Sequence, residues 1–198
     1  MPFNLPILLT WLRIVLIPLV ISVFYLSEAV LSIASQNRMA AIIFILAAAT
    51  DWFDGFLARR LNQTSAFGAF LDPVADKLIV TAALLVLVQL SRLNAVIALI
   101  IIGREITISA LREWMAQVGA ARNVAVNSLG KIKTVCQMVG IPFLLFDAPL
   151  TLGHTVINTK KWGHGLIDIA AVLTIWSMLY YMRLAWPQLC HSRWKHSR

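Results

Sequence analysis

The sequence predicts an all-α integral membrane protein with six transmembrane helices. Hydrophobic residues fill 60% of the 198 positions and only 13% are charged, about half of the ~25% typical of a soluble domain. A chain of this size has too few polar residues to cover a water-exposed surface. The composition therefore excludes an ordinary soluble domain, a disordered chain and, despite a net charge of +8, a nucleic-acid-binding module.

Six apolar runs reach the length of about 20 residues that a membrane-spanning helix needs. They lie at about 5–27, 39–60, 70–90, 94–115, 130–147 and 165–186. The first run is too long for a secretion signal and has no basic residues before it, so we interpret it as a retained helix. The second and third runs carry carboxylates in one half. No repeat or long linker divides the chain, and we expect residues 1–198 to form a single membrane-embedded domain.

The basic residues predict the orientation of the spans. With six spans, both termini and the loops after the second and fourth spans share one face. That face carries most of the lysines and arginines, which concentrate on the cytoplasmic side of membrane proteins. We therefore expect a multi-pass protein of the inner (cytoplasmic) membrane, with both termini and the active site in the cytoplasm.

Four of the nine acidic residues fall within 26 positions. They are Asp51, Asp54, Asp72 and Asp76. Spacings of three and four residues place each pair on one helix face, and a carboxylate within a span costs several kcal/mol unless it is paired. Oxygen ligands with no histidine or cysteine nearby favour Mg²⁺ or Mn²⁺, and four carboxylates suit two ions about 3.5–4 Å apart.

Two simpler interpretations remain open for these aspartates. Asp72 precedes Pro73 and suits a helix N-cap followed by proline at the first helical position. Asp51 and Asp54 suit ion pairs with Arg59 and Arg60 at a membrane edge. Neither interpretation accounts for all four carboxylates together.

The whole segment has a defined spacing. It reads Asp51-x2-Asp54-Gly55-x2-Ala58-Arg59-x8-Gly68-x3-Asp72-x3-Asp76. This segment resembles the signature of the CDP-alcohol phosphotransferases, with every fixed position present. The resemblance implies that family's fold of six membrane helices, usually homodimeric, in which an alcohol displaces CMP from a CDP-linked donor with the help of divalent metal.

The resemblance also implies roles for the signature residues. The four aspartates would hold the metals, and Asp76 would in addition act as the general base. The positions that would contact CDP-diacylglycerol are Gly55, Ala58, Arg59 and Gly68. Taken without the signature, Gly55 and Ala58 equally suit close helix packing.

Further blocks resemble the members of this family whose acceptor is glycerol 3-phosphate, which would give phosphatidylglycerol phosphate and CMP. The blocks are Asn4–Pro6 with Thr10 and Arg13, Phe67–Lys77, Gly103–Trp114 and Gly130–Thr134. Thr10 and Arg13 suggest a polar edge of the site early in the first span. Arg13 would equally suit snorkelling to the lipid headgroups.

A second charge cluster lies on the fourth and fifth spans. Its members are Arg104, Arg112, Lys131 and Lys133. Four cations with few anions nearby suit a pocket for a phosphorylated acceptor. Alternatively, the two lysines anchor the chain at the cytoplasmic face, and Arg112 pairs with Glu113 or Glu105, glutamates that would then orient the arginines.

Two other functions fit parts of the pattern. One is a transferase of the same family with a different acceptor, such as a phosphatidylinositol-phosphate or cardiolipin synthase. The other is a cation transporter lined by carboxylates. A transporter site would lie near the middle of the bilayer between repeated halves, whereas these aspartates lie at one membrane edge and no repeat is visible.

Overall fold

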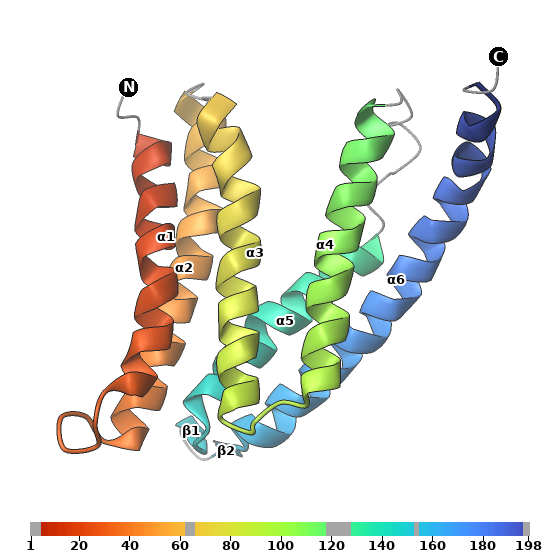
Figure 1. The fold of residues 1–198 in the computed structure, drawn as a ribbon. Coiled ribbons are helices and arrows are strands. Elements are labelled where there is room, and N and C mark those ends of the chain that lie inside the picture. Colours follow the sequence, from red (N-terminus) through yellow and green to blue (C-terminus); the bar gives the residue numbers. More distant parts are fainter. Residues whose placement is uncertain (1–4, 62–65, 118–127, 153–154, 196–198) are drawn as a thin grey trace.

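The computed structural model describes the backbone of residues 5–61, 66–117, 128–152 and 155–195, and the side chains of 8–50, 71–115, 117, 130–151 and 155–183. Six α-helices dominate this part of the chain (Figure 1). They are α1 (Leu5–Ser22), α2 (Ile33–Leu61), α3 (Ala66–Gln89), α4 (Ala95–Gln117), α5 (Ser128–Phe146) and α6 (Thr159–Lys195). A short 3-10 helix, η1 (Val23–Tyr25), follows α1. The all-α prediction is confirmed.

Three of these helices have the length and composition to cross a membrane. The apolar stretches lie at Leu8–Tyr25, Ile33–Thr50 and Thr159–Arg183. They correspond to the first, second and sixth of the predicted spans. Crossing by α3, α4 and α5 stays a prediction.

Two helices extend beyond the apolar runs from which they were predicted. Helix α2 begins at Ile33, because the Ser32 side chain accepts a hydrogen bond from the Ser35 N–H at 3.4 Å and so caps its first turn. The Gln36 side chain then donates to the carbonyls of Leu26 and Leu31. Polar residues can therefore belong to this helix without facing lipid.

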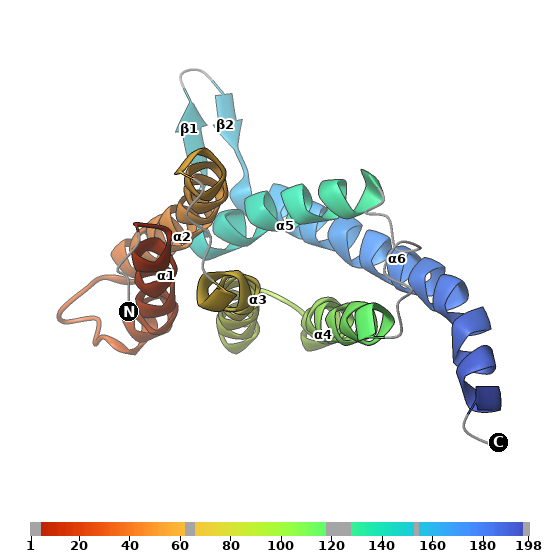
Figure 2. The ribbon, with the colours of Figure 1, turned by 90° about the horizontal axis from the view of Figure 1, so that it is seen from above.

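Helix α6 begins at Thr159 for a similar reason. The Asn158 side chain accepts from the Lys161 N–H at 3.2 Å, and the Thr159 hydroxyl donates to the Ala148 carbonyl at 2.8 Å. Before it stands an antiparallel hairpin that the sequence did not predict, formed by β1 (Leu150–Leu152) and β2 (Thr155–Ile157). The hairpin projects away from the helices when they are seen from above (Figure 2).

The N-cap interpretation of Asp72 is wrong. Helix α3 already begins at Ala66, so Asp72 and Pro73 lie inside the helix rather than at its start. A proline inside a helix provides no N–H for the carbonyl four residues earlier. The capping pattern is therefore overridden by helical residues that precede it, and Asp72 is left free for another role.

The helices are arranged around α1 and α5. Helix α1 packs against α2 and α3, α5 packs against α2 and along α6, and α4 packs mainly on α6. The starts of α1 and α3 and the ends of α2, α4 and α6 lie at one end of the molecule, together with both termini (Figure 1, top). This is the end that carries the signature segment, and we call it the signature end.

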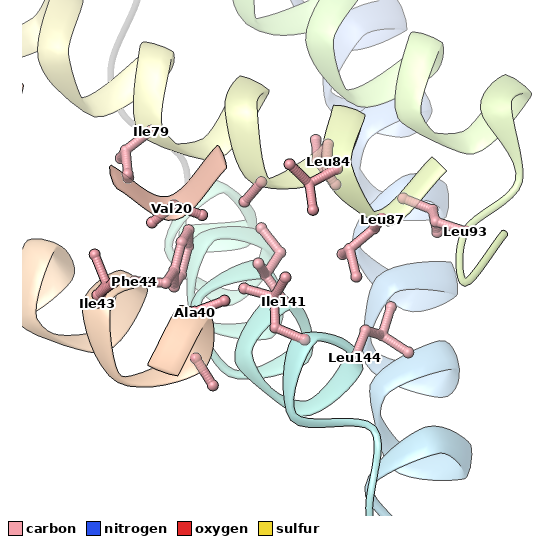
Figure 3. Packing of buried hydrophobic residues seen from close by; sticks show 14 of the residues in the cluster. Val20, Ala40, Ile43, Phe44, Ile79, Leu84, Leu87, Leu93, Ile141 and Leu144 are labelled. Atoms are coloured by element: carbon pink, nitrogen blue, oxygen red, sulfur yellow. The ribbon is translucent and has the colours of Figure 1, made fainter. Parts of the chain in front are cut away.

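The hydrophobic core lies where α1, α2, α3 and α5 meet, toward the opposite end (Figure 3). Fully buried side chains there include Phe44, Leu84 and Ile141. Helices α5 and α6 approach each other closely at Gly163, where a Cβ atom would stand 2.8 Å from Leu144 side-chain atoms. Small residues permit such close packing between membrane helices.

Arg92 joins several elements at the end opposite the signature. Its guanidinium donates to the Leu145 carbonyl at 2.9 Å and to Asn37 Oδ1 at 2.9 Å, and its Nε lies 3.3 Å from Asp147 Oδ2. Burial lowers the pKa of Arg92, and the neighbouring Asp147 carboxylate partly offsets this by raising it. These contacts tie α2 and the α3–α4 connection to the last turn of α5.

Candidate active site

Two side chains of α1 contact the two described aspartates of the signature. The Thr10 hydroxyl donates to Asp72 Oδ1 at 2.5 Å, and Arg13 Nη1 donates to Asp76 Oδ1 at 2.6 Å. Asp72 and Asp76 are four residues apart on α3 and so share a face, just as Thr10 and Arg13 are neighbours on α1. Each oxygen of a carboxylate has more than one lone pair, so accepting a hydrogen bond from α1 is compatible with ligating a cation.

The Arg13 side chain is buried beside Asp76 rather than at the surface of the protein. Its side chain is 0% exposed, whereas that of Asp76 is 39% exposed. A snorkelling arginine keeps its charged head in water or among headgroups, which a fully buried guanidinium cannot do. The snorkelling alternative is therefore wrong, and the prediction that Thr10 and Arg13 form a polar edge beside the signature fits the observed contacts.

The other signature residues lie at the same end of the molecule. Their backbone belongs to the last part of α2 and the start of α3, but their side chains lie outside those that the structure describes: Asp51, Asp54, Gly55, Ala58, Arg59 and Gly68. The side chain of Arg60, which follows the signature arginine, lies outside them as well. Among the described residues, no three carboxylates, histidines or cysteines form a metal site. The four-aspartate site, and the alternative ion pairs with Arg59 and Arg60, stay predictions.

The described donors fit a hard divalent cation. Asp72 and Asp76 offer only carboxylate oxygens, the ligand type that Mg²⁺ and Mn²⁺ prefer. Both side chains are partly exposed, so an ion and a substrate can reach them. This half of the predicted ligand set is compatible with the expected metals.

A second polar cluster joins α4, α5 and α6. Lys133 Nζ forms an ion pair with Glu105 Oε1. Arg104 Nη1 lies 3.5 Å from the same oxygen, and Arg104 Nη2 donates to Ser177 Oγ at 3.1 Å. Arg104 and Lys133 are both buried. The structure thus brings the charges of α4 and α5 together and adds a polar side chain of α6, a helix that the sequence analysis did not include in the cluster.

Arg112 joins this cluster through Tyr181 of α6. Its Nη2 donates to the tyrosine hydroxyl at 3.3 Å. The guanidinium carbons of Arg104 and Arg112 lie 5.9 and 5.5 Å from the centroid of the Tyr181 ring, within range of cation–π attraction. Neither Glu105 nor Glu113 forms an ion pair with Arg112 among the described residues, so that alternative is not what the structure shows.

The two lysines of the predicted cluster differ. Lys133 is only 2% exposed, so the interpretation of its side chain as a headgroup anchor is wrong. Lys131 is exposed and takes no part in the contacts that join Lys133 to the arginines. For Lys131, both the acceptor-binding and the anchoring interpretation stay open.

Ser177 and Tyr181 were missed by the sequence analysis. A signal was present, because Thr174, Ser177 and Tyr181 follow one another at spacings of three and four in a mostly apolar stretch of the helix, which places them on one face. All three are buried. On the same side of the molecule, the buried atoms Arg104 Nε, Gln137 Nε2 and Thr174 Oγ1 have no hydrogen-bond partner among the described residues.

Comparison with known proteins identifies the family. A sequence profile of the CDP-alcohol phosphatidyltransferases matches residues 3–185. The chain belongs to this family. The prediction from the signature is confirmed, and a CDP-alcohol phosphatidyltransferase is a transferase rather than a transporter.

Individual members of the family are also similar to the chain over nearly its whole length. CDP-diacylglycerol–glycerol-3-phosphate 3-phosphatidyltransferases of Salmonella choleraesuis (strain SC-B67), Escherichia coli (strain K12) and Shigella flexneri serotype 5b are each 48% identical to it over 187 residues. The match covers 93% of this chain and 96% of each relative. A CDP-alcohol phosphatidyltransferase has two substrates. The signature aspartates and the basic cluster are the two candidate binding sites for them.

Proposed function

We propose that this chain transfers the phosphatidyl group of CDP-diacylglycerol to glycerol 3-phosphate, forming phosphatidylglycerol phosphate and releasing CMP in phospholipid biosynthesis. Two observations support the proposal: the names of relatives that match nearly the whole chain, and the charge of the cluster between α4, α5 and α6. The net positive charge of this cluster is the observation that favours a phosphorylated acceptor.

The cluster has a formal surplus of two positive charges. Arg104, Arg112 and Lys133 contribute three positive charges and Glu105 one negative charge, which leaves +2. A phosphate monoester carries about −1.5 to −2 at neutral pH, so the phosphate of glycerol 3-phosphate balances the cluster. Free inositol, serine or choline would leave it uncompensated. An inositol phosphate would balance it equally well, and the names of the relatives favour glycerol 3-phosphate.

The donor would lie against the signature. Asp51, Asp54, Asp72 and Asp76 would hold two divalent ions, Mg²⁺ or Mn²⁺, which when bound neutralise charge on the pyrophosphate. The residues that would contact CDP-diacylglycerol are Gly55, Ala58, Arg59 and Gly68. Thr10 and Arg13 keep Asp72 and Asp76 in place by hydrogen bonds.

Asp76 would also accept the proton of the acceptor. The hydroxyl oxygen of glycerol 3-phosphate attacks the phosphorus of the phosphatidyl group, the bond from that phosphorus to CMP breaks, and the hydroxyl proton passes to Asp76. Arg13 fixes one Asp76 oxygen at 2.6 Å. The carboxylate that this contact holds in place would be the proton acceptor.

The membrane arrangement forms part of the proposal. All six helices would cross the inner membrane, with the signature end in the cytoplasm, and two copies of the chain would associate as a homodimer. The position of both termini at the signature end (Figure 1) and the three apolar helices support the arrangement. The water-soluble acceptor would then enter the site from the cytoplasm, and CMP would be released into the cytoplasm.

Release of CMP by the purified protein tests the proposal. The protein is mixed in detergent with CDP-diacylglycerol, Mg²⁺ and one acceptor at a time. We expect release with glycerol 3-phosphate, little with glycerol, serine or inositol, and none after addition of EDTA. Release with inositol 1-phosphate but not with glycerol 3-phosphate would show that the proposed acceptor is wrong and that the proposed phosphatidyl transfer is right. No release with any acceptor, in folded protein, would refute the proposed function.

A further inference from the structure

We propose that Tyr181 on α6 is a positioning residue that sets the specificity for a phosphorylated acceptor. It would do so by holding Arg104 and Arg112 as a pair that faces the acceptor phosphate. The inference rests on the proposed function and adds to it a residue and a helix that the signature does not include.

The four cations of the cluster do not have equal access to a phosphate. Lys133 is already engaged with Glu105, which compensates its charge, and Lys131 stands outside the contacts. Arg104 reaches Glu105 only at 3.5 Å, the limit of a hydrogen bond, and Arg112 pairs with no carboxylate of the described residues. The uncompensated charge therefore lies on the two arginines.

Tyr181 is the side chain that the two arginines share. They stand eight residues apart on α4, about two helical turns, and yet both guanidinium groups lie within 6 Å of its ring centroid. Two positive charges held around one ring repel each other unless an anion lies near them. The negative face of the aromatic ring offsets part of that repulsion but carries no net charge. A bound phosphate dianion would supply the negative charge that the ring does not provide.

The environment of Tyr181 restricts the arginines further. The tyrosine is 4% exposed, and the neighbouring Tyr180 ring lies edge-on to it, with centroids 5.9 Å apart. Its hydroxyl accepts from Arg112 at 3.3 Å. One turn deeper, Ser177 accepts from Arg104 at 3.1 Å and donates to the Thr174 carbonyl at 2.9 Å. Helix α6 thus fixes one donor of each arginine, and Arg104 also reaches Glu105 through Nη1 at 3.5 Å. The remaining guanidinium donors would face the ligand.

Steady-state kinetics of two variants test the inference. Tyr181→Phe removes the hydroxyl and keeps the ring, whereas Tyr181→Leu removes both. We expect KM for glycerol 3-phosphate to rise about 3- to 10-fold in Tyr181→Phe, which is the size of one hydrogen bond, and by more in Tyr181→Leu. In Tyr181→Phe, kcat and KM for CDP-diacylglycerol should stay within about twofold of the wild type. Tyr180→Phe is the matched control and should leave all three constants unchanged.

A double variant tests whether Tyr181 acts through Arg112. In an Arg112→Met background, Tyr181→Phe should raise KM for glycerol 3-phosphate no further, because the hydroxyl has lost the group that it positions. If the fold-increases in KM for glycerol 3-phosphate caused by the two substitutions instead multiply in the double variant, Tyr181 does not act through Arg112.

Several results would overturn the inference. One is an unchanged KM for glycerol 3-phosphate in folded Tyr181→Phe and Tyr181→Leu. Another is a fall in kcat, or an equal rise in KM for both substrates, with a lower thermal unfolding midpoint in Tyr181→Phe, which would assign the residue a structural role. Wild-type protein that uses no phosphorylated acceptor would instead refute the proposed function, so the two failures are distinguishable.

Discussion

Arg13 and Asp76 lie 63 positions apart in the sequence, and their side chains meet at 2.6 Å. The contact joins the first helix to the last aspartate of the signature. The arginine is fully buried, whereas the aspartate is partly exposed, so the cation is fixed inside the protein and the carboxylate stays accessible. Helix α1 therefore contributes to the candidate site although it lies outside the signature.

Replacing Arg13 should damage both stability and activity. Arg13→Met leaves the partly exposed Asp76 without this cation, and loss of a hydrogen bond between charged groups costs about 1.5–3 kcal/mol. We expect a lower thermal unfolding midpoint in detergent and CMP release reduced at least 100-fold. Arg13→Lys, which keeps the charge but not the geometry of the guanidinium, should recover part of the stability and little of the activity. Full activity in Arg13→Met would separate the residue from the site.

Thr10→Val tests the other contact from α1. The substitution keeps the shape of the side chain and removes the hydroxyl that donates to Asp72. With Asp72 less well fixed, we expect a higher Mg²⁺ concentration at half-maximal rate and a turnover reduced about tenfold, as is typical for residues that orient metal ligands. Thr107→Val is the matched control, because Thr107 is exposed and donates only to a carbonyl within its own helix. An unchanged Mg²⁺ dependence in Thr10→Val would contradict the assigned role.

The two lysines of the basic cluster should behave differently. Lys133→Met removes a buried cation and leaves Glu105 without its ion-pair partner, so we expect KM for glycerol 3-phosphate to rise more than tenfold and the unfolding midpoint to fall. Lys131→Met, on an exposed side chain, should change both quantities little. Adding Glu105→Gln to Lys133→Met should restore stability but not KM. The reverse order of effects for the two lysines would refute the assignment of Lys133 to the acceptor pocket.

Two glycines of α6 provide a test of the fold that does not involve the site. An alanine Cβ at Gly163 would stand 2.8 Å from Leu144, whereas at Gly165 nothing lies within 4 Å. Gly163→Ala should therefore lower stability by about 1–3 kcal/mol through overpacking. Gly165→Ala should be neutral or stabilising by up to about 1 kcal/mol, because alanine favours a helix. Thermal unfolding in the same detergent distinguishes the two, and an equal effect would contradict the close packing of α5 on α6.

The sequence predicted the helices and much of the candidate site, and its errors have physical causes. Apolar runs predict where a helix meets lipid, so α2 and α6 were predicted too short, since their polar ends are helical without being apolar. The N-cap pattern at Asp72 is a local rule, and the preceding turns of α3 override it. The carboxylate spacing predicted a shared face for Asp72 and Asp76 because helical geometry alone determines it.

Contacts between helices were harder to predict. The contact of Tyr181 with Arg104 and Arg112 depends on how α6 packs against α4, and the periodicity of two apolar helices does not determine their rotation relative to each other. The pairing of Lys133 with Glu105 depends on α5 in the same way. Thr10 and Arg13 were predicted as a polar edge because a charged residue inside an apolar run requires a partner, but the sequence did not reveal which aspartate each would contact.

The most direct test of the account is the activity of Asp76→Asn. The substitution keeps the size of the side chain and its hydrogen-bonding capacity toward Arg13, but it removes the charge that a metal ligand and general base require. We predict that the variant, once shown to be folded although it lacks the ion-pair partner of Arg13, releases no CMP from CDP-diacylglycerol with glycerol 3-phosphate at any Mg²⁺ concentration. Release at a rate comparable to that of the wild type would contradict the central claim that the carboxylate beside Arg13 performs the chemistry.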